Sequence, residues 1–187
     1  DHPQIRHNGE ATTIEDPERG PVELVGPVAQ FSELPSLLER SAPRLGENTG
    51  PFAARAPLTP SVAQLPHALS GTTIVEMGYF YAMPYGVTLT AALGARVIKI
   101  EPKAGDPMRT SFGAPDSGAA KTMEGKESIA LDLQTAAGKE IARKIAASAD
   151  VFVNGFRTGV AEKMGLDYAS LKQLNPGIVY VHATGYG

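Results

Sequence analysis

The chain has 187 residues, of which 42% are hydrophobic and 20% charged, with a formal net charge of −3 and a pI near 5.8. These values are ordinary for a globular protein, and the slight acidity gives no support for binding to nucleic acid or to an anionic membrane. The absence of cysteine excludes disulfides, thiolate metal ligands and thiol nucleophiles. No apolar run reaches the roughly 20 residues of a membrane span and no signal peptide is recognisable, so we expect a cytoplasmic protein.

The first 50 residues predict a small β-hairpin. Residues 10–15 and 22–25 have the composition of strands, and Asp16–Gly20 between them has the composition of a turn. Two strands are only marginally stable alone, so this segment must pack on something larger. A stretch with prolines at 43, 51, 57, 60 and 66 follows. Such a stretch cannot form a helix or a central strand, and we expect a linker over residues 51–68.

From residue 69 onward the sequence alternates between strand and helix patterns. Parallel strands need crossover connections, so this alternation favours an α/β fold with a parallel sheet. The predicted fold class is a Rossmann-like half-domain preceded by a small β-hairpin tail. The expected strands are 72–77, 96–100, 128–133, 151–153 and one from 178; the expected helices are 84–93, one capped by Thr135 that runs to 147, 160–164 and 168–174.

The turn after the first strand lacks the usual nucleotide-binding motifs. Met77–Pro84 stands where a dinucleotide fold has its Gly-x-Gly-x-x-Gly pattern, and no Gly-Lys-Ser/Thr phosphate loop exists. Three aromatic residues, Tyr79, Phe80 and Tyr81, occupy this turn instead. Aromatic surfaces at a strand end would suit a flat heterocycle. On spacing alone, packing against the sheet edge is the more favoured explanation.

Several collinear segments resemble one enzyme family. They are Leu69–Glu76, Leu93–Pro107, Ser128–Leu133, Ala149–Gly159, Met164–Tyr168, Leu174–Tyr180 and Gly185–Gly187. Together they resemble the opening of family III CoA-transferases, the group that contains formyl-CoA transferase, the carnitine CoA-transferases and α-methylacyl-CoA racemase. The resemblance covers residues 69–187.

The N-terminal segment resembles the other end of the same family. The similarity lies in residues 1–5, 15–20, 26–32 and 42–49, which look like the final hairpin and tail of a family member. The family's tail thus precedes its head, through either a circular permutation or a cut across the junction of two tandem copies. The tandem junction is favoured, because a permuted domain would still need its middle. The expected domains are a tail of one copy (1–50), a linker (51–68) and the first part of another copy (69–187).

The resemblance implies a mechanism with an aspartate nucleophile. In the family, an aspartate takes the acyl group from acyl-CoA as a mixed anhydride and then forms an aspartyl-CoA thioester. That aspartate lies some tens of residues beyond the segment matching Gly185–Gly187, so we expect no catalytic residue in this chain, and the chain alone is expected to be inactive. Structural roles are expected for the aspartates present, which are Asp106, Asp116, Asp132, Asp150 and Asp167.

The resemblance also assigns the CoA side of the site by position. Adenine and ribose contacts fall on Tyr79, Phe80 and Tyr81, and further contacts on Leu131, Gln134, Gly155, Phe156, Lys163 and Thr184. Lys163 would meet a phosphate and Thr184 lies toward the pantetheine end. The structural alternatives are a solvated Lys163 and a core Phe156.

Two departures from the family pattern keep a second function open. Glu127 replaces a cation, and Gly155 replaces an asparagine, in regions that the resemblance connects with CoA. These changes indicate weakened CoA binding and motivate an alternative to the transferase, a degenerate copy that serves as a scaffold. The racemase branch of the family is a further alternative. The implied partners are an acyl-CoA, a carboxylic acid and a second copy, as an interlocked homodimer or a tandem pseudo-dimer. No metal cofactor is implied.

Overall fold

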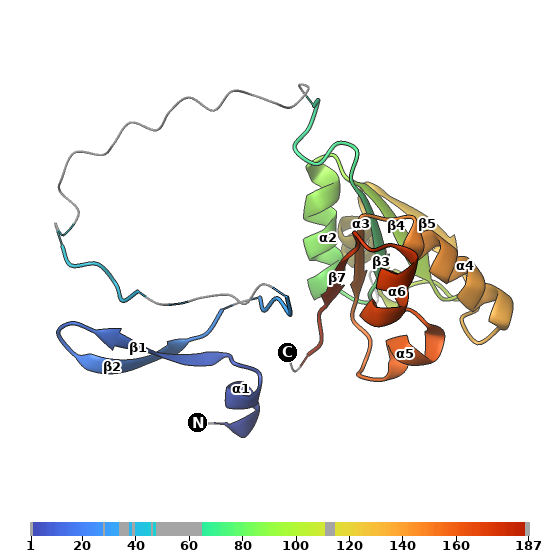
Figure 1. Ribbon diagram of the computed structural model, residues 1–187. Coiled ribbons are helices and arrows are strands. Elements are labelled where there is room, and N and C mark those ends of the chain that lie inside the picture. The colour runs from blue at the N-terminus through green and yellow to red at the C-terminus, as the bar shows by residue number, and fades with distance from the viewer. Residues whose placement is uncertain are drawn as a thin grey trace. The chain divides into compact units, whose positions relative to one another are not determined.

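Figure 1 shows a computed structural model of the chain, which describes residues 2–27, 29–33, 38, 40–45, 47, 65–110 and 115–185. The secondary-structure elements belong to two compact units, which we describe separately. The first contains the elements up to Val25, and the second contains the elements from Thr73 onward. Most of the predicted linker, residues 51–64, lies outside the described residues.

The first unit contains the predicted hairpin. Strands β1 (Ala11–Asp16) and β2 (Gly20–Val25) pair antiparallel, with Ala11 opposite Val25 and Asp16 opposite Gly20. The Asp16 carboxylate accepts the amide N–H groups of Glu18 and Arg19, each at 3.0 Å, which closes the turn. A short helix α1 (Pro3–His7), which we did not predict, precedes the hairpin. The hairpin prediction is confirmed.

The second unit is built on a five-stranded parallel sheet. Its strands are β3 (Thr73–Met77), β4 (Arg96–Glu101), β5 (Lys126–Ala130), β6 (Val151–Asn154) and β7 (Val179–His182). Their order across the sheet is β5-β4-β3-β6-β7, which is the order 3-2-1-4-5 of a Rossmann fold. The connections contain α2 (Ala82–Ala92), the 3₁₀ helix η1 (Pro107–Arg109), α3 (Pro115–Met123), α4 (Ala136–Ala147), α5 (Val160–Met164) and α6 (Tyr168–Leu174). The predicted fold class is confirmed.

The two faces of this sheet bury different residues, because successive side chains of a strand point to opposite faces. On β3, Val75 and Met77 join the larger apolar cluster, which includes residues of α4, α5 and α6. Ile74 joins a smaller cluster with Val87 of α2. Figure 1 shows α2 on one side of the sheet and α4 to α6 on the other.

Helix ends are fixed by residues that the sequence made recognisable. The Thr135 hydroxyl accepts the N–H of Gly138 at 3.0 Å and caps α4 as predicted. Gly138 is required there, since a Cβ at this position would lie 2.0 Å from the backbone oxygen of Asp132. The Asp167 carboxylate caps α6 by accepting the N–H of Ser170 at 2.9 Å.

Two predicted boundaries need correction, and one helix was not predicted. The strand predicted at 128–133 lies at Lys126–Ala130, because Asp132 turns the chain toward α4 by accepting the N–H of Gln134. Helix α3 was not predicted, since its segment consists mainly of small and polar residues and has no strong apolar period. The helix predicted at 84–93 begins two residues earlier, at Ala82.

Candidate functional site

The sheet has one place where its strand order reverses, between β3 and β6, and the turns after three strands come together there. The N–H of Gly155, which follows β6, donates to the carbonyl of Met77 at the end of β3, at 3.3 Å. The N–H of Ala183, which follows β7, donates to the carbonyl of Asn154 at 2.9 Å. His182 Nε2 lies 2.7 Å from the carbonyl oxygen of Phe156. In open α/β sheets this position, beyond the carboxyl ends of the strands, is where ligands bind.

Two glycines shape this edge. A Cβ on Gly78 would lie 1.7 Å from Cε of Met83, so the start of α2 packs directly on the glycine. Gly155 differs, because a Cβ there would meet only ordinary contacts, the nearest being the carbonyl oxygen of Ala183 at 3.4 Å. The structure therefore accepts a Cβ at Gly155 without a close contact.

The segment Gly78–Pro84, which we call the aromatic turn, presents its rings to solvent. Tyr79, Phe80 and Tyr81 are 39%, 48% and 50% exposed. Phe80 has φ of 65°, the left-handed conformation that a bulky residue rarely adopts. The Tyr81 ring stacks on Tyr85 with 5.2 Å between centroids, so one of its faces is already covered. Partial burial raises the pKa of Tyr79, which keeps its phenol protonated at neutral pH.

The other residues assigned by position have different surroundings. Leu131 and Phe156 are buried in the larger apolar cluster, so their side chains serve the core. Gln134 is exposed in the turn before α4, and Lys163 is exposed on α5. Thr184 is half-buried just beyond β7. Backbone contacts thus bring the segments of Gly155 and Phe156 to the ends of β3 and β7. Gln134 and Lys163 lie on the connections that contain α4 and α5.

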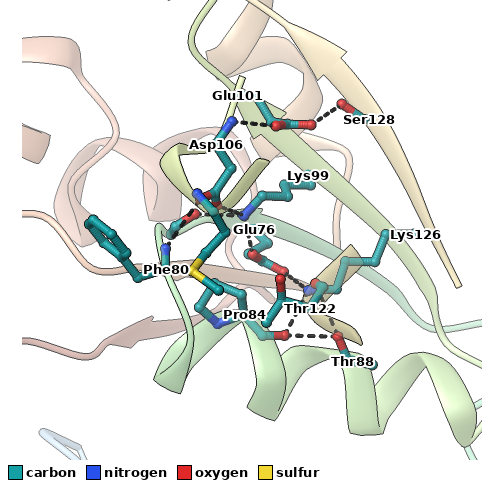
Figure 2. A network of polar contacts seen from close by, with 12 residues as sticks. Glu76, Phe80, Pro84, Thr88, Lys99, Glu101, Asp106, Thr122, Lys126 and Ser128 are labelled. Atoms are coloured by element: carbon teal, nitrogen blue, oxygen red, sulfur yellow. Dashed lines mark hydrogen bonds and ion pairs between the residues drawn. The ribbon is translucent and has the colours of Figure 1, made fainter. Parts of the chain in front are cut away.

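Beneath the aromatic turn lies a set of buried charges that the sequence analysis missed (Figure 2). We call Glu76, Lys99, Asp106 and Lys126 the buried charge network. Lys99 Nζ lies 2.7 Å from Glu76 Oε1 and 3.0 Å from Asp106 Oδ2, and Lys126 Nζ also pairs with Glu76. The available signal was a charged residue within the apolar part of two strands, the glutamate of Thr-Ile-Val-Glu-Met and the lysine of Arg-Val-Ile-Lys-Ile-Glu.

A second polar group supports the network from β4. Glu101 accepts from Arg109 Nε at 2.9 Å, from Arg109 Nη2 at 2.7 Å and from the Ser128 hydroxyl. It also accepts the backbone N–H of Asp106 at 2.7 Å. The guanidinium of Arg109 is the main cause that lowers the pKa of the Glu101 carboxyl to about 2. Glu101 is therefore ionised at neutral pH, and it fixes the loop that carries Asp106.

The aspartates have structural contacts where the structure describes their side chains. Asp150 accepts the N–H of Thr73 at 2.7 Å, and Asp132 pairs with Lys103 at 3.0 Å. Asp167 caps α6, and Asp106 belongs to the buried charge network. The side chain of Asp116 lies outside the described residues.

Glu127 lies away from the turns that form the site. It stands opposite Ile98 in the register of β4 and β5, in the amino-terminal half of the sheet. Its exposed carboxylate pairs with Arg96 through two hydrogen bonds of 2.8 Å. The structure thus gives Glu127 a partner at the opposite end from the site, and removes it as support for a degenerate copy.

Within the described residues, no three or more histidine, aspartate or glutamate side chains gather as a metal site would require. No helix in that part of the chain is both long and apolar enough to cross a bilayer.

The fold defines the class: a Rossmann-like α/β domain whose strand order reverses between β3 and β6. The sequence profile of CoA-transferase family III matches residues 69–187, and the chain belongs to this family.

Individual relatives agree with this assignment. The chain is 33% identical over 168 residues to the succinyl-CoA–L-malate CoA-transferase alpha subunit of Chloroflexus aurantiacus, covering 87% of this chain and 36% of that protein. It is 38% identical over 128 residues to the cinnamoyl-CoA:phenyllactate CoA-transferase of Clostridium sporogenes, covering 63% and 31%. A CaiB/BaiF family protein from Brucella suis superposes with a TM-score of 0.55 at 38% identity, over 62% of this chain and 33% of that one. The chain thus spans about a third of the length of these relatives.

Proposed function

We propose that this chain supplies CoA-binding residues of an enzyme that moves CoA between carboxylic acids. The observation that carries the proposal is the match of residues 69–187 to the family III profile, over the same residues that form the Rossmann-like sheet. The meeting of the turns after β3, β6 and β7 supports it, because a long thin ligand needs an open edge where several backbone segments converge.

The exposed rings of the aromatic turn are proposed to meet the adenine and ribose. Tyr79 and Phe80 have accessible ring surface, whereas one face of Tyr81 is covered by Tyr85. A flat purine gains from stacking on such rings. Lys163 is proposed to approach a phosphate, and Gln134 a polar group of the nucleotide. Thr184 and Gly155 are proposed to face the pantetheine arm, with Leu131 and Phe156 supporting the strand ends from the core.

The chemical steps are proposed to follow the family mechanism, with the nucleophilic aspartate supplied by a segment that this chain does not contain. Its carboxylate attacks the thioester carbonyl, which gives a mixed anhydride and releases the CoA thiolate. The thiolate then attacks the aspartyl carbonyl and expels the donor acid, leaving an aspartyl-CoA thioester. The acceptor carboxylate then attacks the aspartyl carbonyl and expels the CoA thiolate, which gives a second mixed anhydride. The thiolate attacks the acceptor's carbonyl in this anhydride, which forms the new acyl-CoA and releases the aspartate carboxylate. In this proposal residues 69–187 hold CoA while the aspartate changes partners.

The arrangement of the chain is proposed to be a junction between two family copies, with the tail of one copy in residues 1–50, a linker over 51–68 and the start of the next from 69. The presence of a separate hairpin unit before the sheet unit supports this division. Association with a second copy is supported by α2, which carries no charged residue and exposes Leu89 and Leu93.

The direct test is CoA binding and CoA transfer by the intact protein. Calorimetric titration with CoA measures binding, and liquid chromatography of acyl-CoA products measures transfer. Succinyl-CoA is the first donor to try, with L-malate, glutarate and phenyllactate as acceptors, because the relatives carry these names. We expect binding of CoA and transfer to at least one acid of this set. An intact protein that neither binds CoA nor forms a new acyl-CoA contradicts the proposal.

The degenerate-copy alternative now depends on Gly155 alone. Restoring the amide with Gly155→Asn distinguishes the two functions, since a Cβ at this position meets no close contact. If this chain is a working half-site, the variant changes CoA affinity. If it is a scaffold, the intact protein binds CoA with the same affinity before and after the change.

A further inference from the structure

The buried charge network is balanced within itself. Glu76 comes from β3, Lys99 from β4 and Lys126 from β5, while Asp106 precedes η1. The two carboxylates and two ammonium groups have side-chain exposures of 1% or less. Two positive and two negative charges cancel, so the network needs no counter-ion from outside.

Three members of the network also hydrogen-bond the backbone of the aromatic turn (Figure 2), and Asp106 Oδ1 in addition accepts the N–H of Met108 at 2.9 Å. Lys99 Nζ donates to the carbonyl of Gly78 at 2.6 Å, and Lys126 Nζ donates to the carbonyl of Pro84 at 2.7 Å. Asp106 Oδ1 accepts the N–H of Phe80 at 3.3 Å. The turn is therefore held at its beginning, its middle and its end by three charged groups.

Stability alone does not explain this arrangement. Removing ions from water costs several kcal/mol per ion, and apolar residues of similar volume often serve a core equally well or better. Apolar packing is not directional, however, and cannot fix a carbonyl or an N–H. The left-handed Phe80 needs such fixing, because an unfavourable backbone conformation persists only where surrounding contacts determine it.

The held turn is also the part of the edge with the most exposed aromatic surface. Its backbone is held by buried charged side chains, while the rings of Tyr79, Phe80 and Tyr81 remain partly exposed to solvent. A ligand that stacks on rings already held in place loses less conformational entropy on binding. The arrangement matches a recognition surface that is prepared before the ligand arrives.

We propose that Glu76, Lys99, Asp106 and Lys126 are positioning residues for CoA, which act by holding the aromatic turn in its binding conformation. This inference rests on the proposed function, because it takes CoA as the ligand of the turn. It adds three residues that hydrogen-bond the turn, Lys99, Asp106 and Lys126. It also adds Glu76, which pairs with both lysines. Their removal is expected to weaken binding even where the fold survives.

The test uses the double variant Lys99→Met/Asp106→Leu in the intact protein. It removes one cation and one anion and leaves Glu76 paired with Lys126. We expect a folded protein in which amide hydrogen exchange across residues 78–84, followed by mass spectrometry without ligand, is about tenfold faster or more. The dissociation constant for CoA is expected to rise by about 10- to 100-fold, as for other small misplacements of binding groups.

A second variant is expected to weaken CoA binding by a smaller amount. Lys99→Met/Asp106→Asn keeps an oxygen that can accept the N–H of Phe80 and differs little in volume from the native pair. We expect exchange rates and CoA affinity between those of the wild type and of the leucine variant. This variant also serves if the leucine variant does not fold.

The matched control is Arg96→Met/Glu127→Leu. It removes the same number of charges of each sign from an exposed pair on β4 and β5, without a contact to the turn. Exchange across residues 78–84 and CoA affinity are expected to stay at wild-type values.

The possible results distinguish the positioning role of the network from the proposed CoA binding. A wild-type protein that does not bind CoA overturns the proposed function. A wild type that binds CoA, with network variants that bind it equally well, overturns the positioning role alone. Equal losses of CoA affinity in the network variants and in the Arg96/Glu127 control also overturn it. The effect would then come from removing a pair of charges anywhere in the protein, and not from removing the contacts to the aromatic turn.

Discussion

The two faces of the parallel sheet reach burial in different ways. The face under α4, α5 and α6 is filled by apolar side chains, with Phe152 fully buried and stacked on Tyr180 at 5.6 Å. The face under α2 has a small apolar cluster around Ile74 and Val97, and beside it the buried charge network. Both faces belong to the same strands, so the difference arises residue by residue along each strand.

The apolar face mainly stabilises the fold, whereas the charged face mainly positions a turn of the backbone. Apolar packing stabilises in proportion to the area it removes from water and tolerates changes of detail. On the charged face, the cost of removing ions from water offsets much of the stabilisation by ion pairing. The ions do, however, fix backbone atoms of the aromatic turn, which lies at the carboxyl end of β3. A domain that only needed to fold would have little use for the second face.

The largest effect is expected on the apolar face, with Phe152→Ala. The ring is fully buried, so its loss leaves a cavity in the larger cluster and is expected to destabilise the protein by about 4 kcal/mol. Chemical denaturation measures this loss. The control is Leu174→Ala, whose side chain is exposed at the end of α6. Its expected change in stability is below about 0.5 kcal/mol. A loss for Phe152→Ala as small as that of the control would break the comparison.

On the charged face, the single variant Lys99→Met is expected to cost about 3 kcal/mol, because it leaves Asp106 buried without its cation. The double variant Lys99→Met/Asp106→Leu is expected to lose less than this single variant, since both ions of the pair are gone. Denaturation curves of the two proteins measure the difference. If the double variant is the less stable of the two, the network is a source of stability and the two faces are alike.

The acid range sharpens the comparison further through Glu101. Its folded pKa of about 2 lies below the ordinary 4.5, so its contribution is complete above pH 4.5 and is lost as the pH falls toward 2. Glu101→Gln is expected to flatten the fall of stability in this window by up to about 3 kcal/mol. Unfolding midpoints between pH 6 and pH 2 measure it, with Glu127→Gln as an exposed control. Parallel curves for wild type and Glu101→Gln would contradict the assignment.

The smallest effect concerns Phe80. At its φ of 65° a glycine is not strained, so Phe80→Gly is expected to be about 1 kcal/mol more stable than Phe80→Ala. This reverses the usual preference for alanine. Both variants are expected to bind CoA more weakly than the wild type, because both lack the ring. Thermal denaturation with calorimetric titration tests both points, and an alanine variant at least as stable as the glycine variant would show that the turn is unstrained.

The apolar face was largely predictable. The strand and helix periods from residue 72 to 182 gave four of the five parallel strands within about two residues and placed the Thr135 cap. The strand at 126–130 was misplaced because its residues Lys126, Glu127 and Ser128 are polar, and their partners lie on another strand or helix. The family could be recognised because its motifs are local and collinear.

The charged face was not predictable in the same way. Glu76, Lys99 and Asp106 are separated by up to 30 residues, and a single charged residue in an apolar strand gives no sign of its partner. Glu127 shows the opposite error: its change of sign suggested an effect on a ligand, and its pairing with Arg96 in the amino-terminal half of the sheet was visible only in three dimensions.

The alternation of strands and helices, the hairpin, the capping residues and the family could all be predicted without a structure, since each depends on residues close together in the chain. The tertiary structure alone decided which charges share the interior and which backbone atoms they hold. It also decided that Leu131 and Phe156 face the core while Tyr79 and Phe80 face solvent. The physical reason is that burial and ion pairing depend on distance in space, and the fold brings β3, β4 and β5 together from distant parts of the chain.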